Sequence, residues 1–504
     1  MSTTARALLR RTAALTLGLA LAAATGALAW WGTVTPTLPM SQVLADSQAA
    51  PAADTVYVCP AAPADTIGAV ELGRTTSTTA LTPLDPAATV TWNGERLAPS
   101  TTVLDAADGG VLIARPRGQD AVSVAGAVTT LTADGDLRGL TTAACVPPQA
   151  TAWIVGGSGA PGTSSELRLT NPGTTTVTAA ISLYGPTGPV ATTTANHVAV
   201  PAGETVSVLL EAAAPGQGRL AVFVEADGGL LVPVLVTETL DGETAGGVDV
   251  LTSGAAPATD LTIPGVALVA PAEQGQVADE STGATASDAP VLRIVNPGES
   301  PATVSVSTLG ADGEEPLRGA TALVVDPGAV FDVALTGLAP GDYGVRMRSD
   351  APVTGAVRLV RSAGEYPARS GSLVHDVAWI QAQTGAATRA GTLALPHGQA
   401  LTSQLVLTNT APAPATVTLT SDDGTILREV SIPGSSTLSL PVSELGETAD
   451  ALSVIGLSAP EGTEVVTALV TTTQVEGEAA GTLIGVLTPV TEASRASARQ
   501  VLLR

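Results

Sequence analysis

A seven-residue segment that occurs three times constrains the fold of this chain more than any other feature of its sequence. Leu167–Gly173 reads Leu-Arg-Leu-Thr-Asn-Pro-Gly; it returns little changed as Leu292–Gly298 and in degraded form as Leu405–Ala411. The asparagines stand at positions 171, 296 and 409, so each repeat is longer than 100 residues. Propeller blades and solenoid turns repeat every 20–50 residues or so. We therefore expect each repeat to bury its own core, as beads on a chain.

Alternation of apolar and polar residues follows each copy of the segment. Asn171 precedes Val200 by 29 residues, and Asn296 precedes Val325 by the same number. In the third copy Asn409 precedes Ile432 by 23 residues, which indicates a shorter hairpin. A period of two residues is typical of half-buried strands. The alternating positions are Val177, Ala179, Ile181 and Leu183, then Val304 and Val306, then Val417 and Leu419.

Beyond the N-terminus no segment has convincing helical periodicity, so the sequence predicts an all-β fold. We expect tandem immunoglobulin-like β-sandwich domains after one N-terminal hydrophobic helix. The expected divisions are a signal peptide or membrane anchor (1–31), a linker (32–54), an N-terminal β domain closed by a disulfide (55–148), three sandwich repeats (149–258, 259–376 with a disordered loop at 271–289, and 377–490) and a tail (491–504).

The N-terminal segment predicts export from the cytoplasm. Arg6, Arg10 and Arg11 precede an uncharged stretch over residues 12–31. The triplet Ala27–Ala29 fits a signal-peptidase site, which would remove residues 1–29. The apolar stretch is equally long enough to span a bilayer, with Trp30 and Trp31 at its outer edge. Cleavage and anchoring through residues 12–31 both remain open, and both place the rest of the chain outside the cytoplasm.

Cys59 and Cys145 are the two cysteines of the chain, and both fall in the exported part. A pair of cysteines in an oxidising compartment predicts a disulfide. The alternatives are two buried free thiols or a metal pair, for which no histidine stands nearby. The formal net charge of −24 disfavours nucleic acid as a partner, because an acidic surface repels phosphate backbones.

Few residues are candidates for chemistry, and each has a plainer interpretation. The Asn-Pro-Gly elements are typical of strand-terminating turns. His197, His375 and His397 fall at dissimilar places in the repeats, and no Gly-x-Ser-x-Gly motif accompanies them. We therefore predict no catalytic residue, no cofactor site and no metal site. The glycine-rich segment 156–159 fits a loop between strands better than a phosphate-binding loop. The acidic segments 134–136, 312–314 and 422–424 fit hairpin turns better than calcium ligands.

Trp153 and Trp379 each stand in an Ala-Trp-Ile context just before a repeat. Packing in a core or at a domain junction is the first interpretation of both. A stacking platform for sugars is the alternative, since aromatic rings present flat apolar faces to a ligand.

The chain resembles an uncharacterised family of large extracytoplasmic proteins from actinobacteria, known as a domain of unknown function. The resemblance rests on Cys59-Pro, Cys145-Val-Pro-Pro, Trp153-Ile-Val-Gly-Gly157 and the repeated Asn-Pro-Gly segment. It implies a cell-envelope setting, in some cases linked to surface glycan assembly. It implies no established activity and no catalytic residues.

These observations together favour a non-enzymatic extracytoplasmic protein of the cell envelope. We expect a structural spacer or interaction module for a membrane, protein or glycan partner, with the oligomeric state left open. One alternative is a secreted glycan-binding protein or adhesin. Another is an exported hydrolase, which requires a serine, a histidine and an acid to converge in one pocket.

Overall fold

The computed structural model describes residues 16–28, 30, 53–66, 73–117, 122–192, 196–270, 289–365, 369, 372–385, 390–398, 400–445, 452–477 and 479–491. The chain divides into two units, residues 1–51 and residues 52–504. The expected linker at 32–54, the loop at 271–289 and the tail at 491–504 fall almost entirely outside the described residues.

In the first unit, residues 16–28 form an exposed α-helix. Among the residues that the structure describes, no helix is long and apolar enough to cross a membrane. The expected span over 12–31 lies partly outside these residues, so anchoring stays a prediction.

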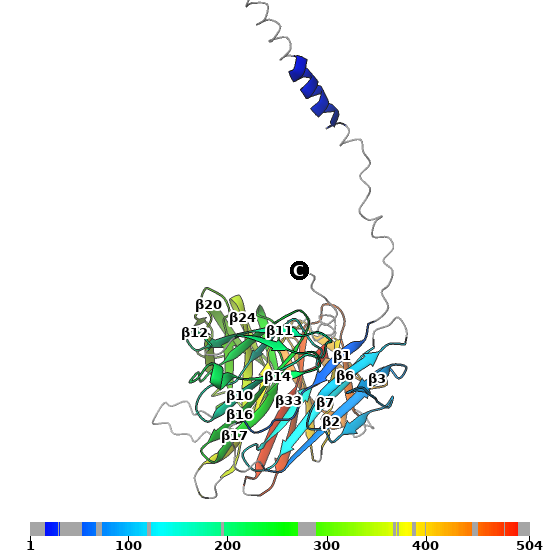
Figure 1. Ribbon diagram of the computed structural model, residues 1–504. Coiled ribbons are helices and arrows are strands. Elements are labelled where there is room, and N and C mark those ends of the chain that lie inside the picture. The colour runs from blue at the N-terminus through cyan, green and yellow to red at the C-terminus, as the bar shows by residue number, and fades with distance from the viewer. Residues whose placement is uncertain are drawn as a thin grey trace, which may run out of the picture. The chain divides into compact units, whose positions relative to one another are not determined.

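The second unit consists almost wholly of antiparallel strands, which confirms the all-β fold (Figure 1). We describe it as an N-terminal module (β1–β8) and three repeat modules (β9–β17, β18–β25 and β26–β34). The N-terminal module contains β1 Thr55–Cys59, β2 Thr75–Pro83, β3 Thr89–Trp92, β4 Glu95–Arg96, β5 Thr102–Leu104, β6 Gly110–Arg115, β7 Val124–Thr132 and β8 Gly139–Ala144. The first repeat module contains β9 Thr151–Val155, β10 Thr163–Thr170, β11 Val177–Gly185, β12 Gly188–Val190, β13 His197–Val200, β14 Thr205–Leu209, the short helix α2 Leu210–Ala213, β15 Ala221–Asp227, β16 Val232–Asp241 and β17 Thr244–Leu251.

The second repeat module contains β18 Ala258–Leu268, β19 Val291–Val295, β20 Ala302–Gly310, β21 Gly313–Pro316, β22 Leu323–Val325, β23 Val330–Ala334, β24 Gly341–Glu365 and β25 Leu373–Gln381. The third contains β26 Ala390–Ala394, β27 Thr402–Asn409, β28 Ala415–Thr420, β29 Ile426–Ile432, β30 Ser436–Pro441, the 3-10 turn η4 Val442–Glu444, β31 Val454–Ser458, β32 Val465–Val475, β33 Gly481–Leu487 and β34 Val490–Thr491. The boundary expected between residues 376 and 377 lies inside β25.

One strand arrangement is common to all four modules. The strand orders are β5-β2-β7-β8, β14-β10-β16-β17, β23-β19-β24-β25 and β30-β27-β32-β33. In each order the last strand of the quartet pairs with the strand just before it in sequence. The N-terminal module is therefore a fourth copy of the same arrangement, although it lacks the repeated Asn-Pro-Gly segment.

Local sequence explains most of these strands. β11 alternates buried and exposed residues along its length, as a strand with one face in the core does. The hairpin between β3 and β4 turns through Asn93 and Gly94, whose φ angles of 47° and 88° suit a tight two-residue turn. β7 differs from β11, because it is buried almost throughout and does not alternate.

The modules share their cores. The apolar cluster of the second repeat module includes Val406 and Ile484 of the third. The cluster of the third includes Ala125 and Ala127 of the N-terminal module. The modules are thus packed against one another, and not separated as beads, because each leaves an apolar edge that only a neighbour covers.

Candidate functional site

The repeated asparagines form buried turns at the ends of β10, β19 and β27. All three side chains are fully buried. The Asn171 amide nitrogen donates to the carbonyls of Thr175 (2.8 Å) and Val200 (2.9 Å). Its oxygen accepts the backbone N–H of Gly173 at 2.9 Å. Asn296 and Asn409 make the same three kinds of bond, to Ser300, Val325 and Gly298 and to Ala413, Ile432 and Ala411. The sequence spacing from each asparagine to Val200, Val325 or Ile432 therefore reflects a hydrogen bond from the asparagine side chain to that residue.

The predicted disulfide is confirmed: Cys59 and Cys145 are bonded, which closes the N-terminal module across 86 residues. Both half-cystines are buried beside Leu81 and Leu112.

The last strands of the four quartets, β8, β17, β25 and β33, meet in one place, which we call the central junction. β8 contacts β17 and β33, and β25 contacts the same two strands, so the four strands close a ring. Figure 1 shows β33, in red, beside the cyan strands of the N-terminal module. Small residues permit this approach: a Cβ on Gly139 would lie 2.7 Å from Val248, and one on Gly485 would lie 3.0 Å from the carbonyl oxygen of Leu140.

Two buried carboxylates satisfy backbone N–H groups across the junction. Asp376 on β25 is fully buried and accepts the N–H of Ile484 at 2.7 Å and of Leu140 at 3.3 Å. Asp249 on β17 accepts the N–H of Trp379 at 2.6 Å. Each also accepts the N–H of the next residue on its own strand, Val377 and Val250. Edge strands carry unpaired N–H groups, and these carboxylates take the place of a neighbouring strand.

Burial raises the pKa of Asp249 and that of Asp376 to about 7 each. The N–H groups oppose this rise, and for Asp376 so does the charge of Arg138. The Arg138 guanidinium is itself buried and donates to the carbonyl of Ala479 at 3.0 Å. None of these three residues stood out in the sequence. A single acidic residue within an apolar strand, as in Val248-Asp-Val250, was the available signal.

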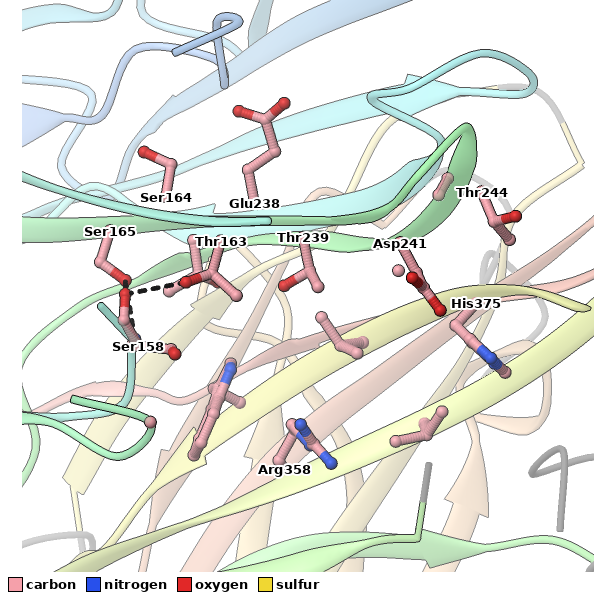
Figure 2. Close-up of a pocket in the computed structure, with 18 of the residues that line it drawn as sticks. Ser158, Thr163, Ser164, Ser165, Glu238, Thr239, Asp241, Thr244, Arg358 and His375 are labelled. Atoms are coloured by element: carbon pink, nitrogen blue, oxygen red, sulfur yellow. Dashed lines mark hydrogen bonds between the residues drawn. The ribbon is translucent and has the colours of Figure 1, made fainter. Parts of the chain in front are cut away.

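A cavity of about 470 Å³ lies between the first and second repeat modules, and we call it the interrepeat cavity (Figure 2). One wall is the face of β10 and β16, where Thr163 stands opposite Thr239 and Ser165 opposite Thr237. Figure 2 shows Thr163, Ser165 and Thr239 on the cavity side of these strands, with Ser164 and Glu238 on the other side. The facing wall, from β24 and β25, includes Arg358, Val360, His375, Val377 and Trp379.

The two candidate tryptophans occupy different surroundings. Trp153 is 9 % exposed and packs against Phe223 and Tyr184, with ring centroids 4.8 Å and 5.3 Å apart. Trp379 is half-buried in the wall of the interrepeat cavity, where the guanidinium of Arg293 lies 5.0 Å from its ring centroid. Both belong to the apolar cluster between the first and second repeat modules. Ligand stacking on them stays a prediction, and of the two Trp379 is the one in a cavity.

The structure separates the histidines. His375 Nδ1 lies 3.0 Å from the hydroxyl of Ser362, its cross-strand neighbour. The carboxylate next in sequence, Asp376, is held by N–H groups within the junction. His397 contacts the carbonyl of Leu395, and His197 contacts Asn196 at the surface.

Hydrogen bonds and an ion pair hold the loop at 156–159 and the acidic turns. The loop at 156–159 joins β9 to β10, and its Ser158 N–H donates to Ser165. In the acidic turns Asp134 accepts the N–H of Arg74, Glu314 pairs with Arg348, and Asp423 accepts the hydroxyl of Ser421. Within the described part of the chain, no group of three or more His, Cys, Asp or Glu side chains could hold a metal ion.

Comparison with known proteins places the chain in a family. A family of unknown function, DUF5719, matches residues 100–443. The chain belongs to this family. The match agrees with the resemblance to a domain of unknown function, and the envelope setting stays an expectation.

No curated protein matches the sequence. A solved structure described as "Biofilm associated protein - BSP domain" shares 11% identity, with 88% of this chain and 96% of that chain covered. The TM-score is 0.12, so this likeness carries no argument about fold or function.

Proposed function

We propose that the protein is a non-enzymatic scaffold of the cell envelope, located outside the cytoplasm. The observation that carries this proposal is the central junction. Four modules that could each bury a core are joined through the last strand of each quartet, at the cost of burying two carboxylates and a guanidinium. Buried ionisable groups are expensive, and they are retained where they specify one arrangement. A chain that needed only separate binding modules would have no use for such a junction.

The disulfide and the N-terminal segment support the location. Disulfides persist in oxidising compartments, and Cys59–Cys145 ties the two ends of the N-terminal module together. The basic residues Arg6, Arg10 and Arg11 before an apolar segment favour export.

The Ser362–His375 pair does not by itself favour a hydrolase. A catalytic histidine needs one ring nitrogen for the nucleophile and the other for an orienting acid. Asp376, the carboxylate next in sequence, accepts the N–H groups of Leu140 and Ile484 instead. We expect a fluorophosphonate probe to leave Ser362 unlabelled, and labelling of Ser362 that depends on His375 would revive the hydrolase alternative.

Small-angle X-ray scattering of residues 52–504 tests the scaffold. The wild type should fit one compact arrangement, and Gly485→Val should expand it, because its side chain would meet Leu140 and Thr142 on β8. Gly218→Val is the matched control, since nothing lies within 4 Å of a Cβ at that exposed position. Scattering from the wild type that requires independently moving modules would refute the proposal.

Cell fractionation tests the location. We expect the protein in an envelope or extracellular fraction with both cysteines protected from alkylation. Crosslinking on intact cells, followed by mass spectrometry, would then identify the partner. Recovery from the cytosol with two reactive thiols would refute an envelope function.

A further inference from the structure

The interrepeat cavity has the size and the boundaries of a ligand site. Its volume of about 470 Å³ falls within the range of small-molecule pockets in proteins. It opens where two modules meet, and such boundaries are preferred places for ligands. Strands supply most of its lining, so the backbone positions of its polar groups are fixed by the sheets.

One wall carries hydroxyl groups, of which a buried one lacks a partner. The hydroxyl of Thr163 donates to the carbonyl of Ala160 at 2.7 Å, and that of Ser165 donates to Ser158 at 2.9 Å. Thr237 shares their face of the sheet and is 7% exposed, yet its hydroxyl has no hydrogen-bond partner among the described residues. A buried polar group without a partner is costly and points to an unseen ligand or water.

The opposite wall combines donors with apolar surface. Arg358 and His375 supply nitrogen atoms, while Val360, Val377 and the ring of Trp379 supply apolar atoms. Figure 2 places Arg358 and His375 across the cavity from Thr239 and Asp241. A ligand would therefore meet polar groups on two sides and hydrocarbon between them.

The charges around the cavity are nearly balanced. The guanidinium of Arg293 is held by both oxygens of Asp332, at 2.9 Å and 3.1 Å. One wall carries the guanidinium of Arg358 and the other the carboxylate of Asp241. The net charge of −24 over the whole chain further disfavours an anion. This balance of charges favours a neutral ligand over a charged one.

We propose that the interrepeat cavity binds a neutral carbohydrate of about disaccharide size. Each sugar hydroxyl both donates and accepts, which matches threonine hydroxyls, arginine donors and a carboxylate acceptor in one site. The C–H faces of the sugar ring match the valines and Trp379. This proposal deepens the scaffold function and rests on it for the biological source of the sugar.

Titration of residues 52–504 with neutral disaccharides tests the proposal. Cellobiose, maltose and N,N′-diacetylchitobiose are suitable probes, followed by tryptophan fluorescence and by saturation-transfer NMR. We expect saturable binding of at least one probe. Thr237→Val should weaken it about tenfold, the equivalent of one hydrogen bond to a buried hydroxyl. Thr239→Val is a second variant at the half-buried neighbouring position and should weaken binding as well.

Thr129→Val is the matched control. The Thr129 hydroxyl on β7 is also buried and has no hydrogen-bond partner among the residues that the structure describes, but it does not line the interrepeat cavity. This variant should bind as the wild type does. Three results would each overturn the proposal: no saturable binding, equal affinity of the wild type and Thr237→Val, or binding confined to an acidic disaccharide. The first of these would show that the cavity holds only water. Scattering data on the same samples keep this failure separate from a failure of the scaffold, because sugar binding and module packing are measured independently.

Discussion

The turn within each repeat and the junction between modules solve the same problem with opposite chemistry. At the turn, Asn171 meets two carbonyls and one N–H group, so it must donate and accept. At the junction, Asp376 meets N–H groups from three strands, including its own, so it needs only to accept. An amide suits the first setting and a carboxylate the second. The backbone groups left over at each place therefore explain which side chain stands there.

The difference has a consequence for pH. An amide does not titrate, so the turns hold at any moderate pH. The carboxylates of the junction exchange a proton near neutrality, because burial raises the pKa of Asp249 and of Asp376 to about 7. Cohesion within a module and cohesion between modules are thus separable by experiment.

The N-terminal module offers a third solution. Asp85 follows β2 and precedes Pro86, as Asn171 follows β10 and precedes Pro172. Its carboxylate accepts the N–H of Ala87 at 2.8 Å, but a carboxylate cannot donate to carbonyls. We infer that the disulfide of this module replaces the bonds that an asparagine would make.

The largest expected effect on stability comes from removing the disulfide of the N-terminal module. The double variant Cys59→Ser, Cys145→Ser should lose about 4–5 kcal/mol of stability in the N-terminal module, since the disulfide closes a long loop. Urea unfolding followed by hydrogen exchange would show the loss, with exchange rising first in β1–β8. A loss below about 1 kcal/mol would contradict the inference, because an average point substitution costs about as much.

The next effect tests the choice of amide at the turn. Asn171→Asp should cost about 3–4 kcal/mol, because a buried carboxylate would face the carbonyls of Thr175 and Val200. Thermal or urea unfolding measures the change. Asn196→Asp is the control, since the same substitution at an exposed position should change stability by less than about 0.5 kcal/mol. Equal effects at the two sites would mean that the turn does not depend on donation.

The third effect tests the choice of carboxylate at the junction. The folded-state pKa values of Asp249 and Asp376 lie above the ordinary value of an aspartate. Between about pH 4 and pH 7 the folded chain therefore binds more protons than the unfolded chain. The stability that these groups contribute is present below about pH 4 and is lost as pH rises to about 7. Burial also raises the pKa of Glu238 to about 7, which adds to the same trend.

Urea midpoints measured between pH 4 and pH 7.5 check this slope. The variant Asp249→Asn, Asp376→Asn should flatten it, with Glu238→Gln removing much of what remains. Asp422→Asn, at an exposed turn, serves as the control. A wild-type midpoint that rises with pH over this range would show that the N–H groups and Arg138 outweigh burial.

The smallest expected effect tests Asp85, which stands after β2 where the repeat modules have an asparagine. Asp85→Ala should cost about 1 kcal/mol through the loss of one hydrogen bond at a half-buried turn. Asp85→Asn should cost nothing, because the amide oxygen keeps that bond and the nitrogen gains the ability to donate. A larger cost for Asp85→Asn than for Asp85→Ala would show that the charge itself matters there.

Sequence reasoning reached the class of fold and the turns, because both depend on local signals. Alternation in β11 and the Asn93-Gly94 pair report on a few neighbouring residues. The pairing of Cys59 with Cys145 followed from there being two cysteines. The N-terminal copy escaped notice because the asparagine is replaced by Asp85 and because β2, rich in threonine, does not alternate.

The junction and the interrepeat cavity could not be predicted in the same way. Leu140, Asp376 and Ile484 lie far apart in the sequence, and no local pattern brings them together. In the sequence nothing distinguishes Thr237 from other threonines in strands; its place in the cavity depends on the second repeat module, which forms the facing wall. The Ala-Trp-Ile context drew attention to Trp379, but its place in the wall of a cavity between two modules required the structure.

The ring at the central junction also fixes an order of events. β8, β17 and β25 are made before β33, which spans Gly481–Leu487 and contacts both β8 and β25. Until that segment emerges, the apolar edges of three finished modules and the carboxylate of Asp376 have no partner from β33. A chain that folds as it is made would therefore have folded modules while these apolar edges are still exposed. A chain truncated before β33 would be expected to retain its sheets and yet aggregate.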